Sequence, residues 1–487
     1  MSLLIAISSA KGGTGVSTLA RNMAVFLAQV GKSTALVDLS GSLSNIEAFS
    51  RLDEHQVVSD GPAYLKVKPG LPNLEVFLAK GEREGLWEEM LARLGRSEIE
   101  ALVMDLRFDD SSFASRVLRT CPLRVLVTRP EPTSVWELYA CASRLVEDAL
   151  DEKLDGGIAS VRAAASSDDW LAGFLSPHDI MDIAGSAELV DSVLETIRGM
   201  RIGFLVNMVQ EREDFDLGRA IESVGTRVFA LPLQDLGSVE RDVAIGAALR
   251  SRVPLLVHMP YSKGGRDLEG LVRRLLSTPD VDHLRPRLEV RAPGDPGNLY
   301  DALEVDRGAG EHEIRKATKR IKEVFGGSTH ATVELRRPSA IGRILERAED
   351  AHLTLLDRRL KREYDRELVR QEGASSYLAR PWDERPAMPT SAHAFPRHDV
   401  PSDPVPEEGV TGAWLAAARE KRAMTLDEMS EISKVSVTYL RAIEEEAFAD
   451  LPEPVYVRGF LTAYSRTLGL DADAVVQSYL DLIDASS

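Results

Sequence analysis

A glycine-rich segment near the N-terminus has the residue types and spacing of a phosphate-binding loop. It lies between the β-branched run Leu3 to Ser9 and a helical pattern, and it reads Ser9-Ala10-Lys11-Gly12-Gly13-Thr14-Gly15-Val16-Ser17-Thr18. Glycines let the backbone curl so that its N–H groups point at a phosphate chain, and the N-terminus of the following helix adds a favourable dipole. The order of strand, glycine-rich turn and helix therefore predicts a site for the phosphates of a nucleotide.

The segment resembles the deviant Walker A motif of the MinD/ParA ATPases, Lys-Gly-Gly-x-Gly-Lys-[Ser/Thr]. The resemblance covers most of residues 1–280, and its further landmarks are Val37-Asp38 and Asn45 (switch I), Met104-Asp105 (Walker B) and Thr128-Arg129-Pro130-Glu131-Pro132. Three later segments look most like the flagellar regulator FlhG branch: Leu231-Pro232-Leu233-Gln234-Asp235, Val253-Pro254-Leu255 and Pro260-Tyr261-Ser262.

This resemblance implies ATP and Mg²⁺ as cofactors. The residues it assigns to the nucleotide are Lys11, Gly12, Gly13, Thr14, Gly15, Ser17, Thr18 and, at the adenine base, Asn207. The hydroxyl of Ser17 would ligate Mg²⁺, and Asp105 would hold a water of that ion. Lys11 would reach the partner's nucleotide across a nucleotide-dependent homodimer.

Two departures from the family pattern affect catalysis. Val16 stands where the family has the loop lysine that reaches the β- and γ-phosphates, and Ser40 stands where switch I carries the aspartate that positions the attacking water. Phosphoryl transfer needs cations on the transferred group and an oriented nucleophile. A replacement carboxylate two residues beyond Asp105 is missing, because that position is Arg107 and only Asp109 and Asp110 follow. The sequence leaves three readings open: a nucleotide-binding domain with weak or no turnover, an empty relic, or an ordinary ATPase.

The elements that must position the loop alternate along residues 1–280. Short β-branched runs alternate with helical patterns, at Leu3 to Ser9, Thr34 to Asp38, Leu102 to Asp105, Arg124 to Thr128, Ile202 to Val206 and Val228 to Leu231. Such alternation predicts a parallel sheet with helices on both faces, which binds ligands at the carboxyl ends of its strands. We expect an α/β P-loop domain with a mainly parallel sheet, interrupted by a helical insertion at about 151–200 and followed by two small all-α modules.

The first module, residues 298–370, has 16 basic and 14 acidic residues. Asn298 to Val305 with Glu311 to Arg320 resembles helices I and II of a DnaJ-type J domain, and Ala348 to Leu353 with Leu356 to Asp365 resembles its helices III and IV. The His-Pro-Asp loop that stimulates the DnaK chaperone is missing, since Gly326-Gly327-Ser328-Thr329-His330-Ala331 follows Phe325. The sequence of this module therefore predicts basic helices that serve in packing or docking, and no co-chaperone activity. A linker rich in proline, residues 371–408, follows it.

The second module, residues 409–487, has the spacing of a helix-turn-helix, with Thr425 and Ser436 as expected caps. It resembles Cro/repressor-type domains and, through Tyr456-Val457-Arg458-Gly459-Phe460-Leu461-Thr462-Ala463-Tyr464, the cytoplasmic domain of the cell-shape protein RodZ. In RodZ the later helices of that domain bind the actin homologue MreB. The resemblance makes Tyr456, Arg458, Phe460 and Tyr464 the candidate partner contacts, although aromatics at this spacing also fit a helix core.

The charge of this module disfavours DNA as its ligand. It has 7 basic and 13 acidic residues, a net charge of −6, and the run Glu444-Glu445-Glu446 ends the candidate recognition helix opposite Lys434 and Arg441. Phosphate contacts supply most DNA affinity and require cations. We therefore expect a protein partner, of the cytoskeletal or polar-assembly kind, and keep DNA binding by a transcription regulator as the alternative.

The amino-acid composition narrows the class of protein and its expected compartment. The 487 residues are 44% hydrophobic and 28% charged, with 59 basic and 77 acidic residues and a net charge of −18, which is typical of a soluble globular protein and unlike a protein that coats nucleic acid. Two cysteines, Cys121 and Cys141, do not support a disulfide framework, and neither a transmembrane run nor an export signal is evident. We expect a cytoplasmic bacterial adaptor for spatial organisation or regulation; an active partitioning-type ATPase is a further alternative.

Overall fold

The computed structural model describes most of the chain. The described residues are 3–40, 56–60, 64–79, 83–108, 112–154, 158–165, 174–184, 186–276, 290–291, 297–327, 329–335, 337–372, 406, 409–422, 424–433, 435–452, 454–468 and 470–486. Asn45, Asp109, Asp110, Lys434 and nearly all of the predicted linker 371–408 lie outside them. None of the described helices is long and apolar enough to cross a membrane.

A mainly parallel sheet forms the centre of residues 1–280, as the sequence predicts. Its strands in the described residues follow the order β3-β4-β5-β2-β6-β1-β7-β8-β9. Their bounds are β1 Leu3–Ser9, β2 Thr34–Asp38, β3 Gln56–Asp60, β4 Tyr64–Lys68, β5 Leu74–Ala79, β6 Ala101–Arg107, β7 Leu123–Thr128, β8 Ile202–Val209 and β9 Leu233–Glu240. Among the described strands only β4 is antiparallel to its neighbours, so the carboxyl ends of β1, β2, β6, β7 and β8 meet at one edge.

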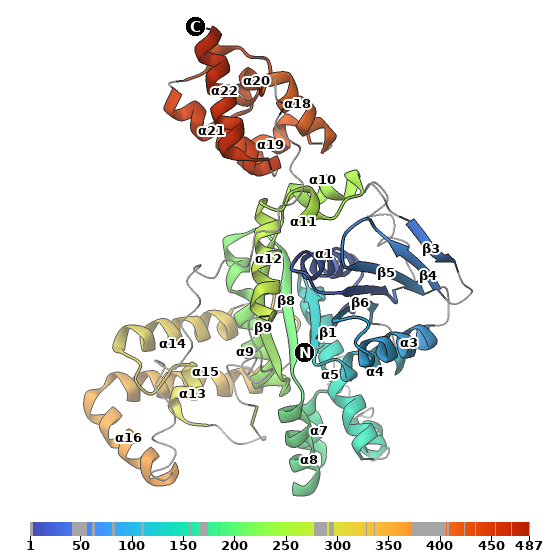
Figure 1. The fold of residues 1–487 in the computed structure, drawn as a ribbon. Helices are drawn as coiled ribbons and strands as arrows, with labels where there is room; N and C mark the ends of the chain where they lie inside the picture. The colour runs from blue at the N-terminus through green and yellow to red at the C-terminus, as the bar shows by residue number, and fades with distance from the viewer. Residues whose placement is uncertain are drawn as a thin grey trace.

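Helices cover both faces of the sheet (Figure 1), and its central strands are therefore buried on both sides. Successive residues of β1 show the two faces: Ile5 and Ile7 pack with helix α1, whereas Ala6 packs in the cluster on the opposite face. The helices of residues 1–280 are α1 Val16–Gln29, α3 Arg83–Gly95, α4 Ser112–Thr120, α5 Pro132–Lys153, α6 Ala159–Ala165, α7 Pro177–Ala184, α8 Ala187–Gly199, η1 Arg212–Asp216, α9 Leu217–Phe229, α10 Val243–Ser251, α11 Leu255–His258 and α12 Lys263–Leu276. The described part of the insertion 151–200 is helical, as predicted.

One predicted strand is wrong. Residues 228–231 end helix α9 and form the turn after it, with Ala230 in the left-handed conformation (φ 58°), and the strand β9 begins only at Leu233. A short apolar run has the same hydrophobicity in a buried helix end as in a strand, so periodicity alone could not separate them. The three neighbouring strands β3, β4 and β5, which end at the sheet edge formed by β3, are not predicted by the sequence.

The described residues of the predicted J-like module form four helices, α13 Leu299–Leu303, α14 Glu311–Gly326, α15 Pro338–Leu356 and α16 Arg358–Glu372. Its core is continuous with the core on one face of the sheet. Figure 1 shows its helices beside α9 and β9. Glu304, whose side chain is 6% exposed, contacts Arg227 of α9 (3.4 Å) and Arg320 of α14 (3.1 Å), and it accepts a hydrogen bond from Ser223 (2.5 Å). This buried carboxylate ties the module to the sheet domain.

The C-terminal unit contains helices α18 Gly412–Lys421, α19 Leu426–Ser433, α20 Val437–Glu444, η4 Phe448–Asp450, α21 Pro454–Leu468 and α22 Ala472–Ser486. Both expected caps are present: the Ser436 hydroxyl accepts from the backbone N–H of Thr438, and Thr425 and Glu428 exchange two hydrogen bonds. The unit lies at the tip formed by α10 and α11 (Figure 1), where Arg250 forms an ion pair with Glu428. The Ser251 hydroxyl donates to the carbonyl oxygen of Arg422 (3.1 Å).

Acidification is expected to loosen this contact through His258. Its Nε2 donates to the Arg422 carbonyl oxygen (2.7 Å), and burial lowers the pKa of His258 to about 4, although this hydrogen bond raises it. An exposed histidine has a pKa of about 6.5, so the separated state binds more protons below that pH. The stability of the contact is therefore complete above about pH 6.5 and is lost as the pH falls toward about 4. Protection factors of the α10, α11 and α18 amides, which are corrected for the intrinsic pH dependence of exchange, measure this. His258→Gln should remove their pH dependence, and equal protection factors of the wild type at pH 7.5 and 5 would contradict it.

Candidate functional site

The glycine-rich loop joins β1 to α1 at the carboxyl edge of the sheet. Gly13 (φ 78°) and Gly15 (φ 95°) have left-handed backbones, which side chains other than glycine rarely adopt. The side chain of Asn207, at the end of β8, donates from Nδ2 to the carbonyl oxygen of Thr14 (2.7 Å). A Cβ atom on Gly15 would lie 2.3 Å from that Nδ2. The predicted adenine contact Asn207 is thus buried against the loop and holds its turn.

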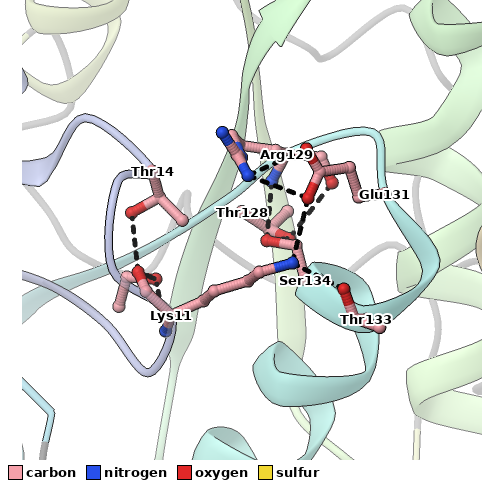
Figure 2. A network of polar contacts seen from close by, with 8 residues as sticks. Lys11, Thr14, Thr128, Arg129, Glu131, Thr133 and Ser134 are labelled. Atoms are coloured by element: carbon pink, nitrogen blue, oxygen red, sulfur yellow. Dashed lines mark hydrogen bonds and ion pairs between the residues drawn. The ribbon is translucent and has the colours of Figure 1, made fainter.

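Lys11, the signature lysine, is held within its own chain. Its Nζ donates to Glu131 Oε2 (2.9 Å) and to the Thr133 hydroxyl (2.5 Å), at the start of α5 (Figure 2). Arg129 contacts the same carboxylate at 2.8 Å. The hydrogen bond from Lys11, together with the Arg129 charge, lowers the pKa of Glu131. Lys11 must leave this carboxylate before it can reach a second subunit.

Val16 and Ser40, the two departures from the family pattern, both make contacts within the fold. Val16 is the first residue of α1 and packs, partly buried, against the apolar cluster on that face of the sheet. The backbone N–H and the hydroxyl of Ser40 both donate to Asp38 Oδ1, at 2.9 and 2.6 Å. Neither residue supplies the phosphate cation or the carboxylate for water that the family pattern has at its position.

The predicted magnesium residues lie beside a cation that the sequence reasoning missed. Asp105 and Asp38 are 1% exposed and are register neighbours at the ends of β6 and β2, while Ser17 is partly buried in the first turn of α1. Arg21 of α1 is also buried, at 3% exposure, and its Nε has no hydrogen-bond partner. Burial lowers the pKa of Arg21 to about 10, and the charges of Asp105 and then Asp38 oppose that shift. The available signal was Arg21, with its neighbour Asn22, within the otherwise apolar run Leu19 to Ala28.

The predicted partner surface of the C-terminal unit must be corrected. Tyr464 is fully buried, and its hydroxyl donates to Glu444 (2.6 Å), so it belongs to the core. Phe460 is partly buried and stacks on Tyr439, with 5.1 Å between ring centroids, and Arg458 is exposed. The side chain of Tyr456 lies outside the described residues.

The acidic run is also less exposed than its sequence implies. The buried guanidinium of Arg419 donates to both oxygens of Glu444, at 2.6 and 2.7 Å. Glu446 accepts from the backbone N–H of Gly412 (2.7 Å), which leaves Glu445 as the exposed acid of the three. The helix is thus less repulsive to DNA than the predicted run of three free carboxylates.

Several relatives each match part of the chain. An uncharacterised ATP-binding protein of Methanocaldococcus jannaschii is 28% identical over 169 residues, 31% of this chain and 62% of the relative. The antiactivator FleN of Pseudomonas aeruginosa is 24% identical over 161 residues, 30% of this chain and 57% of the relative. The cytoskeleton protein RodZ of Streptococcus pneumoniae is 34% identical over 68 residues, 14% of this chain and 25% of the relative. The chain therefore spans less than two thirds of the length of each of these relatives.

Solved structures and family descriptions also resemble parts of this chain. The MinC:MinD cell division protein complex of Aquifex aeolicus aligns with a TM-score of 0.38 at 16% identity, over 57% of this chain and 96% of that chain. The septum site-determining protein MinD complexed with Mg-ADP from Pyrococcus horikoshii aligns with a TM-score of 0.34 at 18% identity, over 57% of this chain and 96% of that chain. Residues 414–475 match a helix-turn-helix domain, and residues 5–255 match the CobQ/CobB/MinD/ParA nucleotide binding domain. This chain therefore belongs to the CobQ/CobB/MinD/ParA nucleotide-binding family.

Proposed function

We propose that this chain is a cytoplasmic regulatory or positioning protein whose P-loop domain binds an adenine nucleotide without efficient turnover and whose helical units bind protein partners. The observation that carries the first half is the loop itself. The left-handed backbones of Gly13 and Gly15 and the hydrogen bond from Asn207 stabilise the turn expected to bind phosphate. Val16 packs against the apolar cluster, and Ser40 donates a hydrogen bond to Asp38. A loop with this geometry favours a bound nucleotide over a relic, and its missing groups favour binding over hydrolysis.

Isothermal titration of the full chain with ATP and ADP tests nucleotide binding. We expect heat with the wild type and none with Gly15→Ala, because the added Cβ meets Asn207 and the backbone has φ 95°. Gly95→Ala is the control, since its Cβ would meet no atom within 4 Å and lies at the end of α3, away from the loop. Absence of heat with the wild type at millimolar ATP would support the relic reading.

A nucleotide-dependent homodimer forms part of this proposal. Lys11 forms an ion pair with Glu131 of its own chain. This ion pair must open before Lys11 can reach the nucleotide of a partner subunit. Both ends of the pair are partly exposed, with side-chain exposures of 30% and 42%, and exposed pairs contribute about 1 kcal/mol or less. A bound phosphate chain therefore needs to supply little free energy to release the lysine.

The C-terminal unit is proposed to bind a cytoskeletal or polar-assembly protein through Arg458 and Phe460. Aromatic and arginine side chains commonly dominate interface energies. The similarity to RodZ makes MreB the first partner to test, by co-sedimentation of the full chain with MreB filaments. Phe460→Ala should weaken binding by about tenfold, whereas Arg466→Ala, an exposed residue of the same helix, should not. Equal losses from both variants would argue against this surface.

DNA binding is the second candidate, because residues 414–475 match a helix-turn-helix domain and two of the three acids at the end of α20 are used internally. A transcription regulator would bind a defined DNA sequence at near-physiological salt. Arg441→Ala would weaken that binding, and Phe460→Ala would leave it unchanged. That pair of results would replace the proposed protein partner with DNA.

A further inference from the structure

Helices α10 and α11 bind the end of helix α18 in the C-terminal unit through two buried donors. Arg422 ends α18, and its carbonyl oxygen accepts hydrogen bonds from the Ser251 hydroxyl (3.1 Å) and from His258 Nε2 (2.7 Å). Ser251 is 3% exposed and His258 is 7% exposed. Carbonyl groups at the end of a helix find no donors within that helix. The P-loop domain therefore supplies donors that the end of α18 lacks.

An ion pair and an apolar contact extend this docking surface. Helix α10 packs against α19, and the buried side chains of Ala247 and Met429 belong to one apolar cluster that continues from the P-loop domain into the C-terminal unit. Arg250 of α10 forms an ion pair with Glu428 of α19. Undocking would expose apolar surface and separate this ion pair as well as the two hydrogen bonds to Arg422.

Asn22 of α1 binds the helix that carries His258. Its side chain is 1% exposed, and its Oδ1 accepts a hydrogen bond from the backbone N–H of Leu256 (2.9 Å), 234 residues later in the chain. Leu256 lies in the first turn of α11, whose N-cap Pro254 provides no side-chain acceptor. Asn22 therefore supplies, from α1, an acceptor for the start of α11.

The same amide group is bound to the helix start that follows the phosphate-binding loop. Asn22 Nδ2 donates to the carbonyl oxygen of Thr18 (2.8 Å), in the first turn of α1, and Thr18 is one of the residues expected to bind nucleotide. Helix α11 packs against both α1 and α10 (Figure 1). One buried side chain thus contacts the start of the loop's helix and the helix that helps to dock the C-terminal unit.

We propose that Asn22 couples the phosphate-binding loop to the docking of the C-terminal unit, so that a nucleotide bound at the loop stabilises the docked unit. A phosphate chain bound at the start of α1 orders the turn that contains Thr18, and this favours the position of Asn22 in which it binds α11. By linkage, docking of the unit strengthens nucleotide binding by the same factor. The ligand in this proposal rests on the proposed nucleotide binding, whereas the coupling through Asn22 can be tested without nucleotide.

The first experiment measures protection factors of the α18 and α19 amides in the full chain without nucleotide. Asn22→Leu leaves the Leu256 N–H without its acceptor, and we expect these protection factors to fall by about tenfold. Amides of β7 and β8 should keep their protection, which separates undocking from general unfolding.

Met23→Leu is the matched control for Asn22→Leu. Met23 is also 1% exposed on α1, and this exchange of similar volumes should change the α18 and α19 protection factors by less than about threefold. Equal protection factors in Asn22→Leu and the wild type would overturn the proposal, and so would equal losses in Asn22→Leu and Met23→Leu.

The second experiment disturbs the docking surface and measures the loop. Arg250→Glu places a negative charge opposite Glu428, and it should lower the α18 and α19 protection factors and raise the dissociation constant for ATP by about fivefold. Arg198→Glu makes the same charge change at an exposed residue of α8 and should alter neither quantity.

Two outcomes separate this coupling from nucleotide binding itself. Undocking by Arg250→Glu with unchanged ATP and ADP affinity would overturn the coupling and leave nucleotide binding intact. If the wild type binds neither nucleotide, the proposed function fails, and the comparison of Asn22→Leu with Met23→Leu still decides whether the loop's helix and the C-terminal unit are coupled.

Discussion

The purified protein is expected to release phosphate from ATP at close to the uncatalysed rate. With Val16 at the position of the loop lysine, the transferred phosphate lacks that cation. Ser40 donates a hydrogen bond to Asp38 and supplies no carboxylate to position the attacking water. Loss of one preorganised electrostatic group typically costs about 10²–10³ in kcat, so two such losses leave little catalysis. Phosphate release followed over hours, with ATP well above its dissociation constant, measures this directly.

Lys11→Ala provides the control for contaminating ATPases, because Lys11 lies in the loop and makes no contribution to any other enzyme in the preparation. Multi-turnover hydrolysis that disappears in Lys11→Ala would show that the domain is an active ATPase of the partitioning type. The double variant Val16→Lys with Ser40→Asp restores both family groups. A gain of phosphate release in that variant would attribute the missing activity to these two positions.

Arg419→Met is expected to unfold the C-terminal unit locally. Arg419 is 8% exposed, bonds both oxygens of Glu444 and donates from Nη1 to the carbonyl oxygen of Met424 (2.7 Å). Its removal leaves the buried Glu444 carboxylate with the Tyr464 hydroxyl as its one hydrogen-bond donor among the described residues. Breaking a buried ion pair by removing one partner costs about 3–5 kcal/mol.

Hydrogen exchange of the α18–α22 amides in the full chain measures this loss region by region. Arg441→Met, which removes an exposed arginine from α20, should change exchange by an amount equivalent to about 0.5 kcal/mol or less. The double variant Arg419→Met with Glu444→Gln should recover part of the loss, because it removes the unpaired charge. Unchanged protection in Arg419→Met would show that the pair does not stabilise the unit.

Much of the architecture was predictable because it depends on local patterns. The β1–loop–α1 order, the strands with β-branched runs and the caps Thr425 and Ser436 each need only a few consecutive residues. The errors occurred where a local pattern fits two structures. Residues 228–231 are apolar in both a helix end and a strand, and Tyr464 has the same spacing from Phe460 whether it faces a partner or the core.

The sequence by itself determined the chemistry that the loop can offer: glycines for the turn, Lys11 as its cation, and no lysine or aspartate at positions 16 and 40. Only the tertiary structure decided where the remaining charges go. It brings Lys11 to Glu131 across 120 residues and Glu444 to Arg419 across 25. Such meetings depend on which strands are neighbours and on which face of a helix packs inward, and no spacing within one segment encodes them.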